Sequence, residues 1–352
     1  MGRVRTLGRG LAARFAAARP FRHLVVDGFL PGALARGVAR ELPRPDDEAF
    51  TEGRVGGDGV AICRDPERLG PSWARVDALT RSADFLAALG EACGVADLRR
   101  NEAGDCGGLF RYAPDSEMDV HVDSNDVDVH CAQTGHRRKI NLLLYLTPGW
   151  REDWGGGFDL YAAPSRAPVK SVAPLFNRCV LFDSHDRSWH GVAPITLPRS
   201  ARGTARFALI LNYFSTDRRG TRPGPPHYNL LFPRPLPARL SPGATPDLAD
   251  LVEVSRLLSR RDARIGALRA LRDAAAGKTA SAPPAPARGP FDFLDALPRE
   301  VRPGAPLSSR GHAALRRLFA ARDRELKALY RGQYSWVQAL RARSPGLVPA
   351  GY

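Results

Sequence analysis

The feature that most constrains the fold of this chain is a change in the spacing of its apolar residues near residue 107. Before that point, apolar residues recur at helical spacing, as in Leu34, Val38 and Leu42. After it, they gather in short runs rich in β-branched and apolar side chains, which Gly, Pro, Asp and Ser separate. These runs predict eight strands, at 107–112, 118–122, 138–147, 157–161, 168–173, 178–183, 189–195 and 204–214.

Eight short strands with no long helix between them predict a closed or double-sheet β structure, such as a jelly roll. A short strand at 22–26 and helical patterns at 34–42, 71–80 and 82–93 come before them. We expect these helices to cover one outer face of the β structure. The expected fold class is therefore mainly β with α.

The chain is expected to divide into three parts. Residues 1–20 form a basic N-terminal segment, residues 21–216 a domain with its β core at about 107–215, and residues 217–352 a Pro-rich connection with a basic helical C-terminal region. Seven prolines between 223 and 242 disfavour a helix or a central strand there. Helical patterns return at 247–259, 262–275 and 309–342, and the low-complexity stretch 280–287 precedes the last of them.

The net charge of +15 lies outside the predicted β domain. Residues 1–20 carry five basic and no acidic residues, and residues 217–352 carry 24 basic and 11 acidic residues. Residues 21–216 carry 23 basic and 26 acidic residues, a net charge of −3. A nucleic acid is therefore not the expected partner of the core, whereas the basic C-terminal region is where an anionic partner would bind first.

Cysteine spacing and hydropathy indicate the compartment. The five cysteines lack CxxC spacing and predict neither a disulfide framework nor a zinc ribbon, which fits a reducing cytosol. No run approaches the 18 uncharged apolar residues of a membrane span. The arginines of residues 1–20 resemble a transit peptide in composition, but the same bias runs through the whole chain and favours an ordinary basic N-terminus. We expect a soluble, cytoplasmic protein without a membrane partner.

The segment His121-Val122-Asp123 is the only His-x-Asp in the chain. Residues i and i+2 of a strand face the same side, so this imidazole and carboxylate can reach one metal ion. His190 opens another predicted strand and can supply a third ligand. Two histidines and one carboxylate are the ligands of non-haem iron(II) oxygenases, which keep positions open for a 2-oxo acid and O2. For His121 taken alone, a hydrogen bond to a neighbouring carboxylate is an equal alternative.

Arg206 lies in the apolar strand pattern 205–211. A buried arginine there needs an anion, and a guanidinium pairs bidentately with a carboxylate such as the distal one of 2-oxoglutarate. The alternative is an outward-facing charge on a sheet.

Residues 107–215 resemble the catalytic domain of the prolyl 4-hydroxylase-like 2-oxoglutarate and iron(II)-dependent dioxygenases. The match follows the family's order through Tyr112, His121-Val122-Asp123, Asn141-Leu-Leu-Leu-Tyr-Leu146, Gly155-Gly-Gly-Phe-Asp-Leu160, Asn177-Arg-Cys-Val-Leu-Phe182, His190-Gly-Val-Ala-Pro194 and Arg206-Phe-Ala-Leu209. The opening segment 21–30 also looks like the family's entry strand and helix.

The resemblance implies a double-stranded β-helix with supporting helices. It implies that His121, Asp123 and His190 bind iron(II) and that Arg206 binds the 5-carboxylate of 2-oxoglutarate. Tyr112 would line the co-substrate pocket, unless it is simply a half-buried strand aromatic. The implied reaction uses O2, releases succinate and CO2, and hydroxylates an unactivated C–H bond. Ascorbate is a candidate accessory reductant. Asp123 argues against a halogenase, which replaces this carboxylate by a small residue.

Two departures from the family pattern bear on the co-substrate site. The spacing from His190 to Arg206 is long, which leaves Arg199 and Arg202 as rival anion binders. Leu144 stands where some relatives place a tyrosine, and Asn141 is the substitute that we consider. Asp126, Asp128 and His130 are interpreted as a solvated loop, and His185-Asp186 as a loop polar pair.

Three hypotheses of function follow. The first is a hydroxylase of a prolyl or other amino-acid residue in a peptide, or of a small molecule such as a natural-product intermediate. The second is a non-catalytic metal-binding β-barrel scaffold whose basic C-terminal region binds nucleic acid or an acidic partner. The third, oxidative nucleobase repair, is disfavoured because residues 207–215 contain no second arginine.

Overall fold

The structure is a computed structural model. It describes residues 9–52, 59–100, 107–125, 136–217, 224–278, 297–343 and 346. Asp126, Asp128 and His130, which the sequence places in a loop after the metal motif, lie outside the described residues. The described part separates into two compact units, one of residues 1–118, 122–162 and 168–229, and one of residues 119–121, 163–167 and 230–352.

The larger of two sheets has eight strands, in the order β1-β10-β7-β12-β5-β3-β2 with β4 paired to β12. Its strands are β1 (His23–Val26), β2 (Thr51–Glu52), β3 (Val60–Cys63), β4 (Arg99–Arg100), β5 (Gly107–Tyr112), β7 (Arg137–Tyr145), β10 (Cys179–Asp183) and β12 (Arg206–Ser215). The central strand β12 pairs antiparallel with β7 on one side and with β5 on the other.

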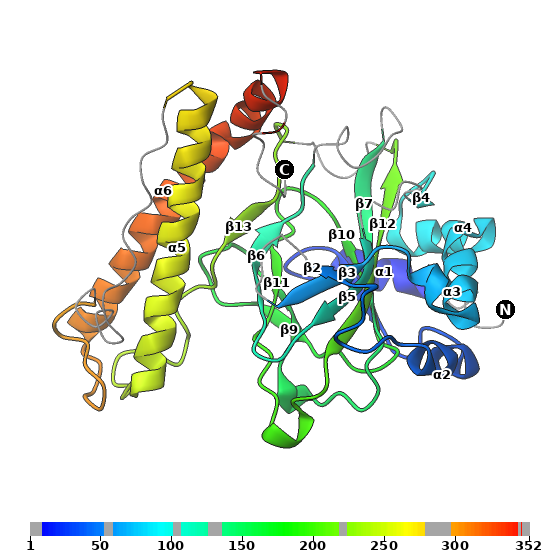
Figure 1. Cartoon of the computed structure of the whole chain (residues 1–352), viewed down its shortest axis with the longest axis horizontal. Coiled ribbons are helices and arrows are strands. Elements are labelled where there is room, and N and C mark those ends of the chain that lie inside the picture. Colours follow the sequence, from blue (N-terminus) through cyan, green and yellow to red (C-terminus); the bar gives the residue numbers. More distant parts are fainter. Residues whose placement is uncertain are drawn as a thin grey trace. The chain divides into compact units, whose positions relative to one another are not determined.

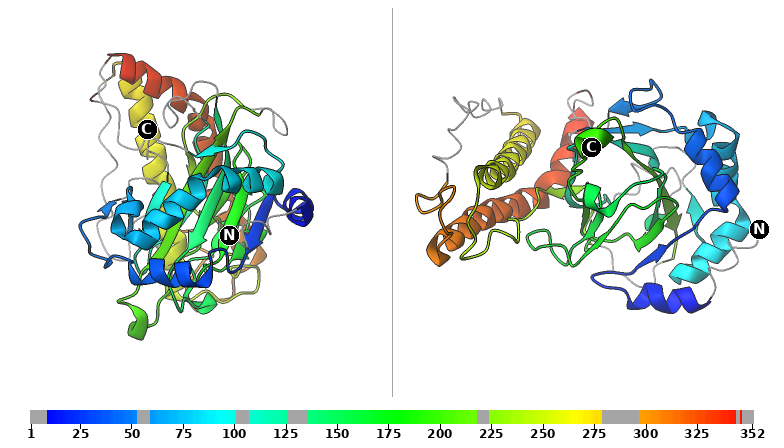
Figure 2. Two further views of the ribbon diagram at one scale, coloured as in Figure 1. Left: turned by 90° about the vertical axis from the view of Figure 1, so that its right-hand side faces the viewer. Right: turned by 90° about the horizontal axis from the view of Figure 1, so that it is seen from below.

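The smaller sheet has five strands, in the order β13-β6-β11-β8-β9. These are β6 (Met118–Val122), β8 (Phe158–Leu160), β9 (Lys170–Val172), β11 (His190–Val192) and β13 (Leu230–Phe232). The two antiparallel sheets form the core of a double-stranded β-helix (Figures 1 and 2), which confirms the fold class expected from the sequence.

Alternating residues of the long strands pack in two different cores. Leu142 and Leu144 of β7 face the N-terminal helices, in a core that also contains Trp73 and Phe85. Leu143 and Tyr145 of the same strand face the smaller sheet, where they pack with Phe158, Leu160 and Val172. Successive side chains of a strand point to opposite faces, so this continuous buried run is the pattern expected for a sheet that is covered on both faces.

Four helices belong to the N-terminal part, and the first residues of two of them explain where they begin. The helices are α1 (Arg9–Ala17), α2 (Gly32–Arg40), α3 (Pro71–Arg81) and α4 (Ala83–Cys93). Pro71 opens α3, where its missing N–H costs nothing. The Ser82 side chain accepts from the Phe85 N–H and caps α4. In the described part of this unit, short 3-10 turns lie at Pro66–Leu69, Glu152–Trp154 and Arg199–Ala201.

The second unit is built on two long helices, α5 (Leu248–Ala275) and α6 (Ser309–Arg343), which lie side by side (Figure 1). A capping box between Asp247 and Asp250 fixes the start of α5. The prediction of two separate helices at 247–259 and 262–275 is wrong, because the single helix α5 spans both ranges. Arg260 and Arg261 interrupt the apolar pattern, but Arg261 is buried and pairs with Asp323 of α6.

The Pro-rich region contains a short strand that the sequence did not predict. The strand, β13, is the edge strand of its sheet, where neighbouring prolines are tolerated. Among the described helices, none is long and apolar enough to cross a membrane. The cytoplasmic location and the domain boundaries after residues 20 and 216 stay predictions.

Candidate active site

The two histidines of the predicted triad are held in the same way. His121 lies near the end of β6 and His190 at the start of β11. In each ring Nδ1 lies 2.8 Å from the backbone oxygen two residues earlier, Asp119 for His121 and Ser188 for His190. A carbonyl oxygen only accepts, so each Nδ1 carries a proton, and in the neutral imidazole Nε2 is then the atom with the lone pair that a metal needs. Both imidazoles therefore have the tautomer of a metal ligand.

Asp123 follows β6 and turns one carboxylate oxygen towards β7. Oδ2 accepts a hydrogen bond of 2.6 Å from Asn141 Nδ2 and lies 3.2 Å from Arg138 Nη1. Both donors favour the charged carboxylate. With Oδ2 engaged in this way, we expect Oδ1 to be the oxygen that a metal binds.

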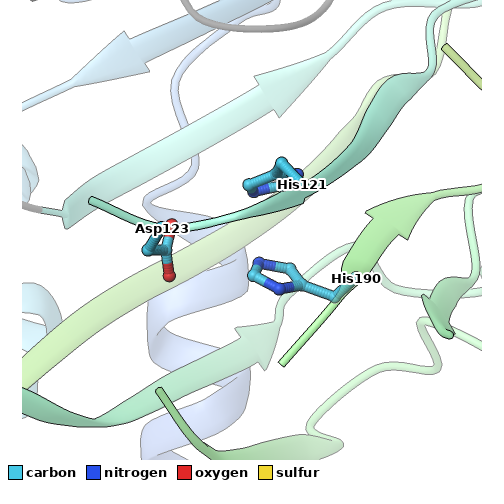
Figure 3. Close-up of side chains that lie close together, drawn as sticks. All are labelled: His121, Asp123 and His190. Atoms are coloured by element: carbon cyan, nitrogen blue, oxygen red, sulfur yellow. The ribbon is translucent and has the colours of Figure 1, made fainter. Parts of the chain in front are cut away.

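The three side chains converge on one point. Ligand atoms of His121, Asp123 and His190 all lie within 4.8 Å of one another, and Figure 3 shows the three groups facing a common space. Among the described residues, no other group of three or more His, Cys, Asp and Glu side chains meets this condition. Two imidazoles and one carboxylate fit iron(II), because this donor set matches the facial arrangement of non-haem iron oxygenases.

His190 is also packed between aromatic rings. Its ring centroid lies 4.7 Å from that of Phe182 and 5.3 Å from that of Phe158. Both phenylalanines belong to the core between the sheets. These rings exclude water from one side of the site and restrict the orientation of the imidazole.

Arg206, the first residue of β12, is 1% exposed. Its guanidinium carbon lies 4.5 Å from the ring centroid of Tyr112 and 4.9 Å from that of Tyr145. Among the described residues, its Nε and Nη1 have no hydrogen-bond partner, and neither has the Tyr145 hydroxyl. Buried donors of this kind are costly unless an acceptor is bound, so the arrangement fits the carboxylate of a ligand.

Burial affects the titration of both tyrosines beside Arg206. It raises the pKa of the Tyr112 hydroxyl, and it raises the pKa of Tyr145 to about 12, although the positive charge of Arg206 acts in the opposite direction on both. Both hydroxyls therefore stay protonated near neutral pH and are available as hydrogen-bond donors.

The structure brings some of the residues predicted for the co-substrate site together and leaves others apart. Arg206 and Tyr112 are opposite each other in the register of β12 and β5. The rival arginines are exposed, and Arg202 lies 3.5 Å from Asp115. Asn141 donates a hydrogen bond to Asp123. That Asn141 also binds the co-substrate stays a prediction.

Sequence reasoning missed Tyr145. It considered the position before, Leu144, which faces the helical core instead. The strand alternation carries the missing signal, because Tyr145 shares the inward face of β7 with Asn141.

Comparison with known proteins identifies the β core. Residues 107–214 match the profile of the 2OG-Fe(II) oxygenase superfamily. The match places this segment, residues 107–214, in the 2OG-Fe(II) oxygenase superfamily. Iron(II) and 2-oxoglutarate are the cofactors implied by this superfamily and by the intact triad of His121, Asp123 and His190. The resemblance found in the sequence is thereby confirmed.

Two curated relatives match shorter parts of the chain. Prolyl 3-hydroxylase OGFOD1 of Mus musculus is 35% identical over 69 residues, which are 18% of this chain and 13% of that protein. The Xenopus laevis protein of the same name is 32% identical over 85 residues, 20% of this chain and 17% of that protein. The chain therefore spans less than a fifth of the length of these curated relatives.

A solved prolyl 4-hydroxylase from Pseudomonas putida is 22% identical to this chain. The TM-score is 0.42, with 58% of this chain and 97% of that chain covered. This likeness assigns neither a substrate nor an activity.

Proposed function

We propose that the protein is a 2-oxoglutarate- and O2-dependent hydroxylase that acts on an unactivated C–H bond. The observation that carries the proposal is the convergence of His121, Asp123 and His190, with both imidazoles in the tautomer of a metal ligand. When bound, iron(II) with 2-oxoglutarate and O2 places one oxygen atom into a C–H bond and the other into succinate, with release of CO2.

Each group of this chain has one task in that reaction. The two Nε2 atoms and Oδ1 of Asp123 would hold the metal on one side and leave the opposite positions open. Arg206 would bind the distal carboxylate of 2-oxoglutarate, with hydrogen bonds from the Tyr145 hydroxyl and an aromatic wall from Tyr112. The aromatic rings beside His190 would keep water away from the metal.

For the substrate, we propose a prolyl or other amino-acid residue in a peptide, with a small molecule as the second candidate. The support is the local identity of 35% with a protein named as a prolyl 3-hydroxylase. The test is succinate release from a panel of proline-containing peptides and small molecules, with iron(II), 2-oxoglutarate and ascorbate present. Turnover above the uncoupled background by a peptide supports the first candidate, and turnover by small molecules alone supports the second.

A non-catalytic scaffold with a basic, nucleic-acid-binding C-terminal region is the alternative. A scaffold does not need both a buried arginine with unpaired donors and a set of converging metal ligands, and this favours the enzyme. Salt-dependent binding of the full-length protein to nucleic acid tests the alternative. Tight binding, together with no succinate release on any substrate, would favour the scaffold.

A further inference from the structure

The strand that carries His121 is bound to the long C-terminal helices. Residues 119–121 of β6 group with residues 230–352 in one compact unit. Within this unit the Asp119 carboxylate is 3% exposed, and its Oδ1 lies 2.9 Å from Arg260 Nη2 of α5. A carboxylate buried to this degree needs a positive partner to stay charged. Arg260 is therefore a strong local constraint on this strand.

A second buried pair adjoins the first. Arg261 is fully buried, and its Nε donates to Asp323 Oδ1 of α6 at 2.9 Å. Burial lowers the pKa of Arg261, and the negative charges of Asp323 and Asp119 oppose this. The buried Arg261 and the half-buried Arg260 of α5 thus pair with one buried carboxylate from α6 and one from β6.

The same helices fix β13, the neighbour of β6 in the smaller sheet. The Tyr330 hydroxyl of α6 accepts from the Leu231 N–H at 3.0 Å and donates to the Leu231 oxygen at 2.6 Å. Arg261 Nη2 donates to the Pro233 oxygen at 2.9 Å. The helices therefore hold both strands, β6 through the Asp119 side chain and β13 through its backbone.

Asp119 also orients the metal ligand directly. Its backbone oxygen is the acceptor for His121 Nδ1, at 2.8 Å. The carboxylate of this residue is bound by α5, while its carbonyl determines the tautomer and direction of the imidazole. A shift of Asp119 would move the hydrogen bond that points His121 Nε2 at the metal.

We propose that Arg260 is a positioning residue for the metal site, and that α5 and α6 are part of the metal-binding apparatus through Arg260, Asp119 and His121. This rests on the proposed function only in assuming that the triad binds a divalent metal. The C-terminal helices then have a definite role, which is to hold one of the three ligands in place.

The test measures metal affinity and needs no substrate. Full-length protein is titrated anaerobically with iron(II), and with manganese(II) as a redox-stable probe, for wild type, Arg260→Gln, Asp119→Asn and the double variant. Positioning predicts that each single variant binds metal about 10- to 100-fold more weakly. The double variant should lose less than the product of the two single losses, because the two residues act through one contact.

Two further variants separate positioning from stability. Arg269 of α5 forms an exposed pair with Glu325 of α6, so Arg269→Gln removes an arginine from the same helix without touching Asp119. We expect it to leave metal affinity unchanged. Arg260→Lys keeps the charge and should retain most of the affinity, which also preserves the test if Arg260→Gln fails to fold.

The outcomes distinguish this proposal from the proposed function. Wild-type affinity in folded Arg260→Gln and Asp119→Asn, with only a lower melting temperature, would overturn the positioning role. Equal loss in Arg260→Gln and Arg269→Gln would also overturn it, because the effect would then come from the helix pair in general. If wild type itself binds neither metal, the proposed function fails first.

Discussion

Asn141 and Asp123 are joined by a short hydrogen bond, 2.6 Å from Nδ2 to Oδ2. The bond connects the inward face of β7 with a ligand that follows β6, and Arg138 approaches the same oxygen at 3.2 Å. Together these donors determine which way the carboxylate turns. Asn141, a polar side chain of the larger sheet, thus orients a predicted metal ligand that follows a strand of the smaller sheet.

Replacement of Asn141 by Ala should weaken iron(II) or manganese(II) binding by about 10- to 100-fold, because Asp123 loses the donor that orients it. Asn212, which is opposite Asn141 in the register of β12 and β7, provides the matched control Asn212→Ala. Calorimetric titration of both variants decides the matter. If both variants bound the metal with wild-type affinity, the hydrogen bond from Asn141 to Asp123 would have no role in metal binding.

Replacement of Arg206 by Met should raise the dissociation constant of 2-oxoglutarate at least thirtyfold. Truncating one partner of a buried charge pair costs about 2–5 kcal/mol. Affinity for the metal alone should stay unchanged, since Arg206 contacts the two tyrosines rather than the triad. Arg202→Ala, at the exposed rival position, should bind 2-oxoglutarate normally. A large loss in Arg202→Ala with none in Arg206→Met would reassign the anion site.

Tyr145→Phe should weaken 2-oxoglutarate binding while leaving the protein without ligand at least as stable as wild type. The Tyr145 hydroxyl is buried beside Arg206 without a well-formed hydrogen bond among the described residues, so its removal should cost the folded protein little. A hydrogen bond to a charged carboxylate contributes about 1.5–3 kcal/mol, which predicts a loss of affinity of roughly 10- to 150-fold. Unchanged affinity would mean that the hydroxyl does not reach the co-substrate.

The Arg261–Asp323 pair makes a separate prediction about stability. Asp323→Asn leaves a buried guanidinium without its counter-charge and should reduce the free energy of unfolding by about 3–5 kcal/mol. Glu325→Gln, which removes a carboxylate from the exposed pair with Arg269, should change it by less than about 1 kcal/mol. Urea unfolding of both variants measures the difference. Similar losses in the two would contradict the role assigned to burial.

The sequence alone was sufficient for the β core and for the three side chains, His121, Asp123 and His190, whose ligand atoms the structure brings together. Strand alternation and turn residues are local signals, and His121, Asp123 and His190 stand in predicted strands or directly beside them. The fold class could be predicted because the short strands have apolar residues on both faces. Few architectures bury both faces of strands this short.

The continuous helix α5 could not be predicted in the same way. Arg261 interrupts its apolar pattern, and the residue that neutralises it, Asp323, is 62 positions away along the chain. The same applies to Asp119, whose partner Arg260 lies on a helix that the sequence treats as an appendage. Pairings between distant charged residues are set by tertiary packing, and a single sequence does not reveal them.

The most direct test of the central claim is an anaerobic titration with iron(II) and 2-oxoglutarate, followed by absorption spectroscopy. If the triad holds the metal and 2-oxoglutarate chelates it, wild type should develop a metal-to-ligand charge-transfer band that saturates at one iron per chain. His121→Ala should develop none. A band of wild-type intensity in His121→Ala, or its absence in wild type with both ligands in excess, would contradict the account.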